Sequence, residues 1–341
     1  MAKKAKSAAA KASAKRSAAA AKTKKIPKPA AMSKVKASKV APGELVTLLD
    51  LMRYGVSRFV EAELVFAHGT TDPVAEAAFI VCEALHLHPD QFEMFAGARV
   101  TAHEALRILA LIDKRIATRK PAAYLVNKIY MRGLPFYVDE RTIVPRSFIG
   151  ELLDSHFSGD LEEEGGSLID DPLNVTRVLD LCTGSGCLAI LACQSFPNAT
   201  VDAVDISPDA LAVAARNVAD YGLEDRVSLY QGDLFDAVND ARYDLIITNP
   251  PYVDAEGMAG LPRECLHEPS IAFDGGDDGL DIVRKILDEA KDHLTPDGGL
   301  LCEIGRGRDM LGDAYPNLPL LWLDTEDSDG EVFWIPAEAL S

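Results

Sequence analysis

One short motif, Asn249-Pro250-Pro251-Tyr252, combines residue types that could bind and activate a planar NH₂ group. Two consecutive prolines cannot continue a central strand, and they hold the chain in a stiff, extended turn with fixed carbonyl groups. An NH₂ group could donate hydrogen bonds to the side-chain oxygen of Asn249 and to the carbonyl of Pro250, while the ring of Tyr252 packs over its plane. Asn249, Pro250 and Tyr252 are therefore the predicted catalytic residues.

The chemistry that suits this arrangement is substitution at an amide or amine nitrogen. An amide nitrogen is a poor nucleophile because its lone pair is delocalised into the carbonyl group. Two acceptors on its hydrogens raise the electron density on nitrogen and orient it, so catalysis rests on positioning and electrostatics. All four residues of the motif, Pro251 included, are predicted to bind the substrate. A turn of purely structural use is the alternative, which the cofactor pattern upstream disfavours.

A glycine-rich turn follows the first strand of the same region. An acid, Asp180, lies on the strand, and two glycines, Gly184 and Gly186, lie where the strand leads into a helix. Without a Cβ atom these glycines let a ligand approach the backbone at the edge where parallel sheets bind ligands. The run matches neither the dinucleotide fingerprint nor the phosphate loop of ATP-binding proteins. The residues predicted to contact a nucleotide-like cofactor are Asp180, Thr183, Gly184, Ser185 and Gly186.

Two further acids follow the next two strands. Asp205 ends the second strand, where a carboxylate can accept hydrogen bonds from two ribose hydroxyls, and Asp233 follows the third, where it suits an adenine amine. Each acid alone is weak evidence, because aspartate is common at strand ends. Together with the glycine turn they resemble the pattern of S-adenosylmethionine-dependent methyltransferases. The resemblance implies S-adenosyl-L-methionine as the cofactor, with Asn249 also in contact with it.

The chain resembles one family of such enzymes over about residues 42–341. Asn-Pro-Pro-Tyr is shared by methyltransferases of DNA adenine and of protein glutamine, and segments outside the motif favour the second group. These segments are Tyr124–Asn127, Phe136–Arg141, Val144–Ser147, His267–Ser270 and Gly275–Leu280. The resemblance is to the protein-(glutamine-N5) methyltransferases, and it implies methylation of a glutamine side-chain amide.

Two branches of this family differ in their protein substrate. One methylates the Gly-Gly-Gln glutamine of peptide-chain release factors, and the other a glutamine of the third protein of the large ribosomal subunit. The segments similar to the ribosomal-protein branch are those around Asn127, Phe136–Arg141, Arg146-Ser147 and Cys182–Cys187. We therefore expect a ribosomal protein as substrate and partner, with a release factor as the first alternative. Glu268 is a predicted substrate contact, and Glu303 is a weaker candidate for the same role.

Alternating strands and helices after Arg177 must position these residues. Their order predicts an α/β fold with a parallel, doubly wound sheet closed by an antiparallel hairpin. The resemblance implies the seven-stranded, Rossmann-like sheet of the class I methyltransferases. The predicted strands are 178–182, 201–205, 227–230, 244–248, 300–304, 318–323 and 331–335, with helices from about 187, 208 and 280.

Three segments are expected before this sheet. Residues 1–40 form a disordered basic tail, and residues 41–120, with apolar residues at helical spacing, a small helical domain that recognises the substrate. Residues 121–148 are a predicted β-hairpin linker to the methyltransferase domain at 149–341. The extended runs that predict the linker are Tyr124-Leu125, Leu134–Val138 and Thr142–Pro145, and an acidic loop is predicted at Ser158–Asp171.

Charge and composition limit the function further. The 341 residues carry a net charge of −18, but residues 1–40 hold 13 Lys and Arg and no acid, which leaves 22 basic against 53 acidic residues and a net charge of −31 in the remainder. A polybasic tail of this kind can bind ribosomal RNA through its phosphates, and a merely solubilising extension is an equal alternative. No apolar run approaches a membrane span, and neither the cysteines nor the histidines show metal-ligand spacing. We expect a cytoplasmic protein without a membrane or metal partner.

Two rival functions remain at this stage. A DNA adenine methyltransferase needs a domain that flips and reads a base, which an acidic chain with a short helical segment does not supply. A non-catalytic protein that binds RNA or ribosomes through the tail would not bind S-adenosylmethionine, so calorimetry with that cofactor distinguishes it.

A chain that begins at Ala41 tests the basic tail. If residues 1–40 bind ribosomal RNA, retention of RNA by the full chain falls steeply as salt rises, because neutralised phosphates release counterions. The shortened chain then loses both the affinity and the salt dependence. Filter binding of both chains at two salt concentrations measures this, and equal, weak retention of the two would contradict an RNA-binding tail.

Overall fold

The computed structural model describes residues 40, 43–157, 168–169, 171–326 and 328–340. The predicted basic tail, apart from Val40, and residues 158–167 of the predicted acidic loop lie outside this part of the chain and stay predictions. The boundaries proposed for the domains also stay predictions. In the part that is described, no helix is long and apolar enough to cross a membrane. The six cysteines are free; Cys182 is half-buried and the other five are buried.

The helices expected before residue 120 are confirmed, and side chains cap two of them. Asp72 accepts hydrogen bonds from the backbone of Val74 and Ala75, and Thr101 and Glu104 form a capping box. Apolar side chains of these helices form a core of their own. The elements are α2 (Leu48–Glu61), α3 (Pro73–Ala84), η1 (Pro89–Gln91), α4 (Phe92–Phe95) and α5 (Ala102–Thr118).

The linker hairpin is shorter than predicted. Strand β1 (Ile129–Met131) pairs antiparallel with β2 (Leu134–Phe136). The prediction of an extended Tyr124-Leu125 is wrong, because these residues lie in helix α6 (Ala122–Val126). There the ring of Tyr124 is buried and its hydroxyl donates to the Thr142 carbonyl, so tertiary burial prevails over the local preference for strand.

The last predicted run of the linker, Thr142–Pro145, forms no strand. Its backbone finds other partners, because the Thr142 carbonyl accepts from Tyr124 and the Val144 N–H donates to Glu268. When side chains supply the hydrogen-bond partners of a segment's backbone, the segment can be buried without pairing to a neighbouring strand.

The predicted doubly wound sheet is confirmed, with seven strands in the order β5-β4-β3-β6-β7-β9-β8. The first five run parallel, and the β8–β9 hairpin closes the sheet antiparallel to β7. The strands are β3 (Arg177–Leu181), β4 (Thr200–Asp205), β5 (Val227–Gln231), β6 (Tyr243–Thr248), β7 (Leu294–Glu303), β8 (Leu321–Thr325) and β9 (Ser328–Pro336).

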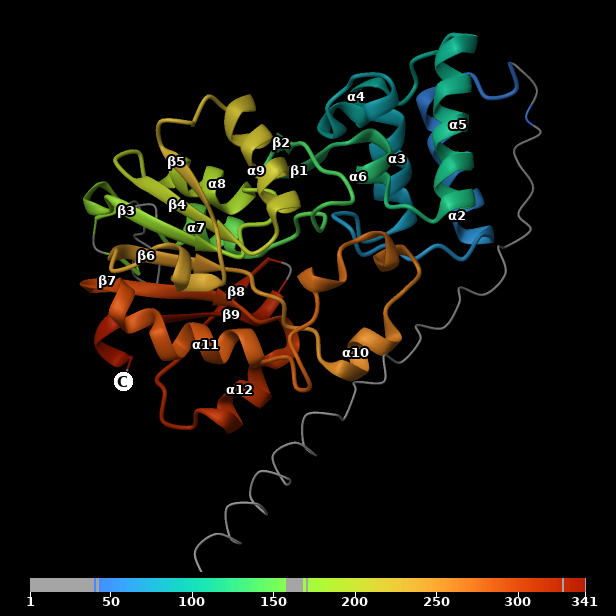
Figure 1. The fold of residues 1–341 in the computed structure, drawn as a ribbon. Helices are drawn as coiled ribbons and strands as arrows, with labels where there is room; N and C mark the ends of the chain where they lie inside the picture. The colour runs from blue at the N-terminus through green and yellow to red at the C-terminus, as the bar shows by residue number, and fades with distance from the viewer. Residues whose placement is uncertain (1–39, 41–42, 158–167, 170, 327, 341) are drawn as a thin grey trace, which may run out of the picture. The chain divides into compact units, whose positions relative to one another are not determined.

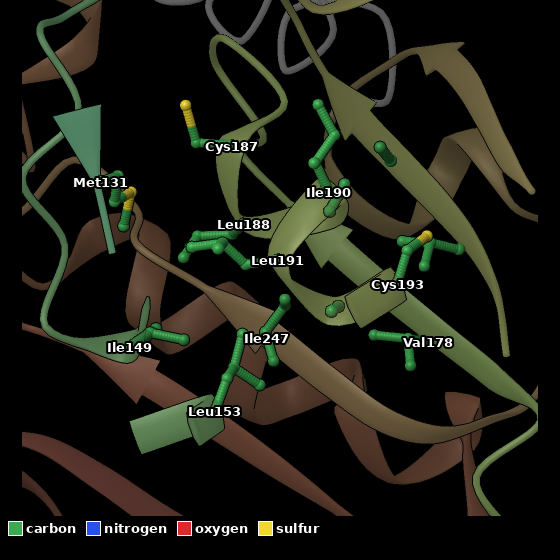
Figure 2. Packing of buried hydrophobic residues seen from close by; sticks show 14 of the residues in the cluster. Met131, Ile149, Leu153, Val178, Cys187, Leu188, Ile190, Leu191, Cys193 and Ile247 are labelled. Atoms are coloured by element: carbon green, nitrogen blue, oxygen red, sulfur yellow. The ribbon is translucent and has the colours of Figure 1, made fainter. Parts of the chain in front are cut away.

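Both faces of this sheet are buried, as expected for parallel strands. Side chains alternate along β3: Val178 enters the core on one face, and Leu179 the core on the other. Figure 1 shows the two layers of helices that cover the faces. Figure 2 shows Met131, Ile149 and Leu153 near side chains of helix α8 (Cys187–Ser195). The covering helices are α7 (Ile149–Ser155), α8 (Cys187–Ser195) and α9 (Pro208–Asp220) on one face, and α11 (Asp281–Glu289) and α12 (Arg308–Ala314) on the other.

A long segment without strands joins β6 to α11. We call residues 253–280 the insertion; it contains α10 (Ala255–Gly260) and two single turns, η4 (Glu264–His267) and η5 (Ser270–Ala272). It contacts the helical segment directly, because Nε2 of His267 lies 2.9 Å from the carbonyl oxygen of Thr118. The other short turns are η2 (Pro172–Asn174), η3 (Leu234–Ala237), η6 (Ala290–His293), η7 (Gly305–Gly307) and η8 (Ala337–Ala339).

Asn217 of α9 joins the linker to the glycine turn. Its side-chain oxygen accepts from the Tyr137 N–H at 2.8 Å, and its amide donates to the carbonyls of Tyr137 at 3.0 Å and Ser185 at 2.8 Å. The side chain is buried, so a substitution would leave the buried Ser185 carbonyl and two half-buried backbone groups of Tyr137 without this partner.

We predict that Asn217→Ala lowers the free energy of unfolding by about 2–4 kcal/mol, the scale of several lost buried hydrogen bonds. Urea unfolding measures the change. Asn198→Ala is the matched control, because the exposed Asn198 amide makes one such bond, to Leu173, and its loss should be small. Equal effects of the two substitutions would contradict the role of Asn217.

Candidate functional site

A cavity of about 270 Å³ lies at the carboxyl ends of the parallel strands. Its wall includes seven of the residues predicted from the sequence: Thr183, Gly184, Ser185, Asp205, Asp233, Asn249 and Pro251. Six others do not line it: Asp180, Gly186, Pro250, Tyr252, Glu268 and Glu303. The structure thus brings the glycine turn, two acids and the start of the Asn-Pro-Pro-Tyr motif to one place, as expected where parallel strands end.

The glycine turn is tied to the acid at the end of the next strand. The N–H of Gly184, whose φ is +57°, donates to Oδ2 of Asp205 at 2.8 Å. Oδ1 of Asp205 accepts from the Ser207 N–H at 2.8 Å. Burial raises the pKa of Asp205, although these bonds oppose the shift. Each oxygen keeps a lone pair, so the carboxylate can still accept ribose hydroxyls.

Gly186 serves packing instead of lining the cavity. It has φ +78° and precedes α8, and a Cβ atom there would lie 3.2 Å from the Cβ of Ala214. Glycine therefore lets α8 begin close against α9.

Asp180 acts from beneath the turn. It is completely buried, and its Oδ2 accepts from the Thr183 hydroxyl at 2.6 Å and from the Ala189 N–H at 3.0 Å. Burial raises its pKa to about 7. The predicted direct contact of Asp180 with a cofactor therefore does not match its place: it positions Thr183, which does line the cavity.

Asp233 has a partner that the sequence did not indicate. Nζ of Lys285 lies 3.0 Å from its Oδ2, and both residues line the cavity. Lys285 comes from α11, 52 residues further along the chain, so no local pattern marks the pair. An adenine amine at Asp233 would share the carboxylate with this ammonium group.

The Asn-Pro-Pro-Tyr turn is enclosed by backbone. A Cβ atom at Gly279 would lie 2.5 Å from the carbonyl oxygen of Tyr252, and a Cβ atom at Gly275 would lie 2.8 Å from the Cα of Tyr252. A Cβ atom at Gly305 would lie 2.6 Å from the Tyr252 ring. The Val253 N–H also donates to the Phe273 carbonyl at 2.8 Å. The glycines of Gly275–Leu280, which the sequence showed only as a resemblance, are thus needed for close contact with the motif.

Glu303 lies behind the Tyr252 ring. The Tyr252 hydroxyl is 3.5 Å from its Oε1, and its Oε2 accepts from the Ser147 hydroxyl at 2.7 Å and the Phe148 N–H at 2.9 Å. Burial raises the pKa of Glu303 to about 7, although the bonds from Ser147 and Phe148 oppose the shift. Glu303 therefore contacts the last residue of the motif, and substrate contact by Glu303 stays a prediction.

Glu268 is buried among protein groups. Its Oε1 accepts from the Val144 N–H at 2.8 Å and from Nη1 of Arg146 at 2.9 Å, and its Oε2 lies 3.2 Å from Nε2 of His68. Burial alone would raise its pKa, but His68 and Arg146 lower it overall. The predicted contact between Glu268 and substrate has no support from this placement, since its oxygens face the protein.

Within the described part of the chain, His68, Cys265 and Glu268 form a group of three side chains that could together bind a metal ion. Sequence spacing could not show it, because His68 precedes the other two by almost 200 residues. The Glu268 carboxylate already has the Arg146 guanidinium as its cation. We therefore assign the group to hydrogen bonding.

The raised pKa of Glu303 predicts a specific pH dependence of stability. Between its ordinary pKa of 4.5 and about 7 the folded protein holds a proton that the unfolded chain releases, so this group's contribution to stability falls as pH rises through that window. Glu303→Gln should reduce the loss of stability by up to about 1.4 kcal/mol per pH unit. Urea unfolding of both proteins from pH 5 to pH 8 measures this, and an unchanged slope would contradict it.

Comparison with known proteins identifies the family. A family model described as "Methyltransferase small domain" matches residues 155–261. A ribosomal protein uL3 glutamine methyltransferase from Bradyrhizobium diazoefficiens is 74% identical over 305 residues, covering 89% of this chain and 95% of that protein. The protein of the same name from Bordetella pertussis is 50% identical over 298 residues, covering 87% of this chain and 97% of that protein. Since both similarities span nearly all of each relative, the chain belongs to the family of the ribosomal protein uL3 glutamine methyltransferases.

Proposed function

We propose that this protein methylates the side-chain amide nitrogen of a glutamine in ribosomal protein uL3, the third protein of the large subunit, with S-adenosyl-L-methionine as the methyl donor. The observation that carries the proposal is that Asn249 and Asp205 line the same cavity. The cavity thus has both an acceptor for the hydrogens of an amide group, Asn249, and an acceptor for ribose hydroxyls, Asp205. The names of the relatives at 74% and 50% identity favour uL3 over a release factor.

The residues of the cavity fit S-adenosyl-L-methionine, which supplies an electrophilic methyl group on a positively charged sulfur when it is bound. Asp205 would hold the ribose hydroxyls and Asp233 the adenine amine. Ile206 and Leu234, which also line the cavity, offer apolar surface to the adenine ring. The backbone at Gly184, where no Cβ obstructs a ligand, would hold the methionine part.

The chain's own contribution to the reaction is to position and polarise the amide. The Asn249 side-chain oxygen and the Pro250 carbonyl would accept the two amide hydrogens, which raises the electron density on nitrogen and directs its lone pair. The Tyr252 ring, which lies close against Gly305, would pack against the amide plane. The surplus proton of the methylated nitrogen passes to water, because an alkylated amide nitrogen is strongly acidic and needs no strong base.

The charge of the chain supports a protein substrate. The net charge of −31 outside the basic tail repels nucleic acid and attracts a basic ribosomal protein, which disfavours DNA adenine as the acceptor. We assign substrate recognition to the helical segment at 41–120 and contact with ribosomal RNA to the tail. We place the reaction in the cytoplasm, where ribosomal proteins are made.

Two substitutions separate chemistry from cofactor binding. Asn249→Ala should lower kcat by about a hundredfold or more and leave the Kd for S-adenosylmethionine nearly unchanged. Asp205→Ala should reduce the binding free energy of the cofactor by about 1.5–3 kcal/mol, the contribution expected of hydrogen bonds to a charged group. Calorimetry gives the Kd, and mass spectrometry of purified uL3 gives the rate and the methylated residue. Near-normal turnover of Asn249→Ala would refute its assigned role, and absence of cofactor binding by the unsubstituted chain would refute the proposed function.

A further inference from the structure

One wall of the cofactor cavity is built without regular secondary structure. Residues 141–147, except Val144, line the cavity, and no strand pairs with them. Buried backbone groups need hydrogen-bond partners, and outside a helix or sheet these must come from elsewhere. Here two of the partners are side chains remote in sequence, since Tyr124 donates to the Thr142 carbonyl and Glu268 accepts from the Val144 N–H. The shape of this wall therefore depends on residues remote in sequence.

Glu268 contacts two residues of this segment, Val144 and Arg146. It accepts from the Val144 N–H at 2.8 Å, and it forms a two-pronged pair with Arg146, at 2.9 Å from Nη1 to Oε1 and 3.3 Å from Nη2 to Oε2. Nη1 of Arg146 also donates to the Val144 carbonyl at 3.1 Å. The carboxylate thus holds both an N–H of the wall and a side chain that lines the cavity, by charge-assisted bonds.

The same carboxylate contacts the helical segment. Nε2 of His68 lies 3.2 Å from Oε2 of Glu268, and both side chains have no exposed surface. His68 precedes α3 and does not line the cavity. Because the low pKa of Glu268 keeps its carboxylate ionised, the imidazole must be the donor of this bond. His68 is thus connected to the cavity wall through one side chain.

We propose that Glu268 is a positioning residue through which the helical segment, by way of His68, holds the Val144–Ser147 wall of the cavity in the shape that binds the cofactor. The inference rests on the proposed function, since it takes this cavity as the site of S-adenosylmethionine. It replaces substrate contact as the role of Glu268. It also gives the helical segment a second task besides recognition of the substrate.

Glu264, the first residue of the turn η4 that precedes Glu268, provides an internal comparison. It is also completely buried, and its Oε1 accepts from the Val65 N–H at 3.2 Å and lies 2.9 Å from Nε of Arg119. These partners belong to the helical segment, and Glu264 does not line the cavity. The two carboxylates therefore share burial and partners in the helical segment, but of this pair it is Glu268 that accepts a hydrogen bond from the wall.

The test is the Kd of S-adenosylmethionine, measured by calorimetry on the full chain. Glu268→Gln keeps the shape of the side chain but places an amide against Arg146, and we expect the Kd to rise about tenfold or more. His68→Ala leaves the Arg146 pair intact, and we expect a rise of about threefold to tenfold. The control Glu264→Gln should change the Kd less than twofold. Thermal unfolding of each variant verifies that it is folded.

A double substitution tests the connection itself. If His68 acts through Glu268, then His68→Ala adds little to the Kd of a Glu268→Gln chain; independent contributions would multiply instead. Multiplied effects, or a folded His68→Ala chain with unchanged Kd, would overturn the inference. If the Glu268→Gln chain does not fold, the Kd of the His68→Ala chain still tests the inference. Absence of binding by the unsubstituted chain would refute the proposed function instead, so the two failures are distinct.

Discussion

The cofactor cavity depends on one constraint: backbone groups buried outside helices and strands must still form hydrogen bonds. The chain leaves the β-hairpin at Phe136 and reaches α7 without another strand, and along this path it forms a wall of the cavity. Two buried carboxylates satisfy its N–H groups, Glu268 at Val144 and Glu303 at Phe148. Since Glu303 also lies beside Tyr252, the wall and the Asn-Pro-Pro-Tyr turn are positioned together.

Close backbone contact is the second condition of the site. Gly275, Gly279 and Gly305 surround Tyr252, and each position lacks room for a side chain. Gly275 and Gly279 lie against the backbone of Tyr252 and Gly305 against its ring, which restricts the residue to few alternative positions. This rigidity suits a reaction that gains its rate from the placement of an amide, because a small displacement of the acceptors would remove the advantage. The glycines thus help to position the Asn-Pro-Pro-Tyr turn, although they need not touch the substrate.

The sequence predicted the features whose signals are local. The Asn-Pro-Pro-Tyr turn, the glycine turn and the sheet follow from proline and glycine chemistry and from apolar periodicity over a few residues. The sequence failed where distant segments decide the outcome. Tyr124 became helical because burial prevailed over its strand preference, and Asp180 lies under the glycine turn because the Thr183 hydroxyl and the Ala189 N–H bind it there. The contacts of His68 with Glu268 and of Lys285 with Asp233 have no signature in the chain order.

The burial of Glu264 bears on which part of the chain can fold alone. By position it belongs to the methyltransferase segment at 149–341, which contains all seven strands of the large sheet. Its partners Val65 and Arg119 lie before that segment, as does His68, the partner of Glu268. A fragment of 149–341 would keep both carboxylates, lose these partners and expose to water the surface that the helical segment covers. The segment with the sheet therefore lacks part of its native contacts when it is separated, and a hybrid of two related enzymes must take its helical segment and its insertion from the same parent.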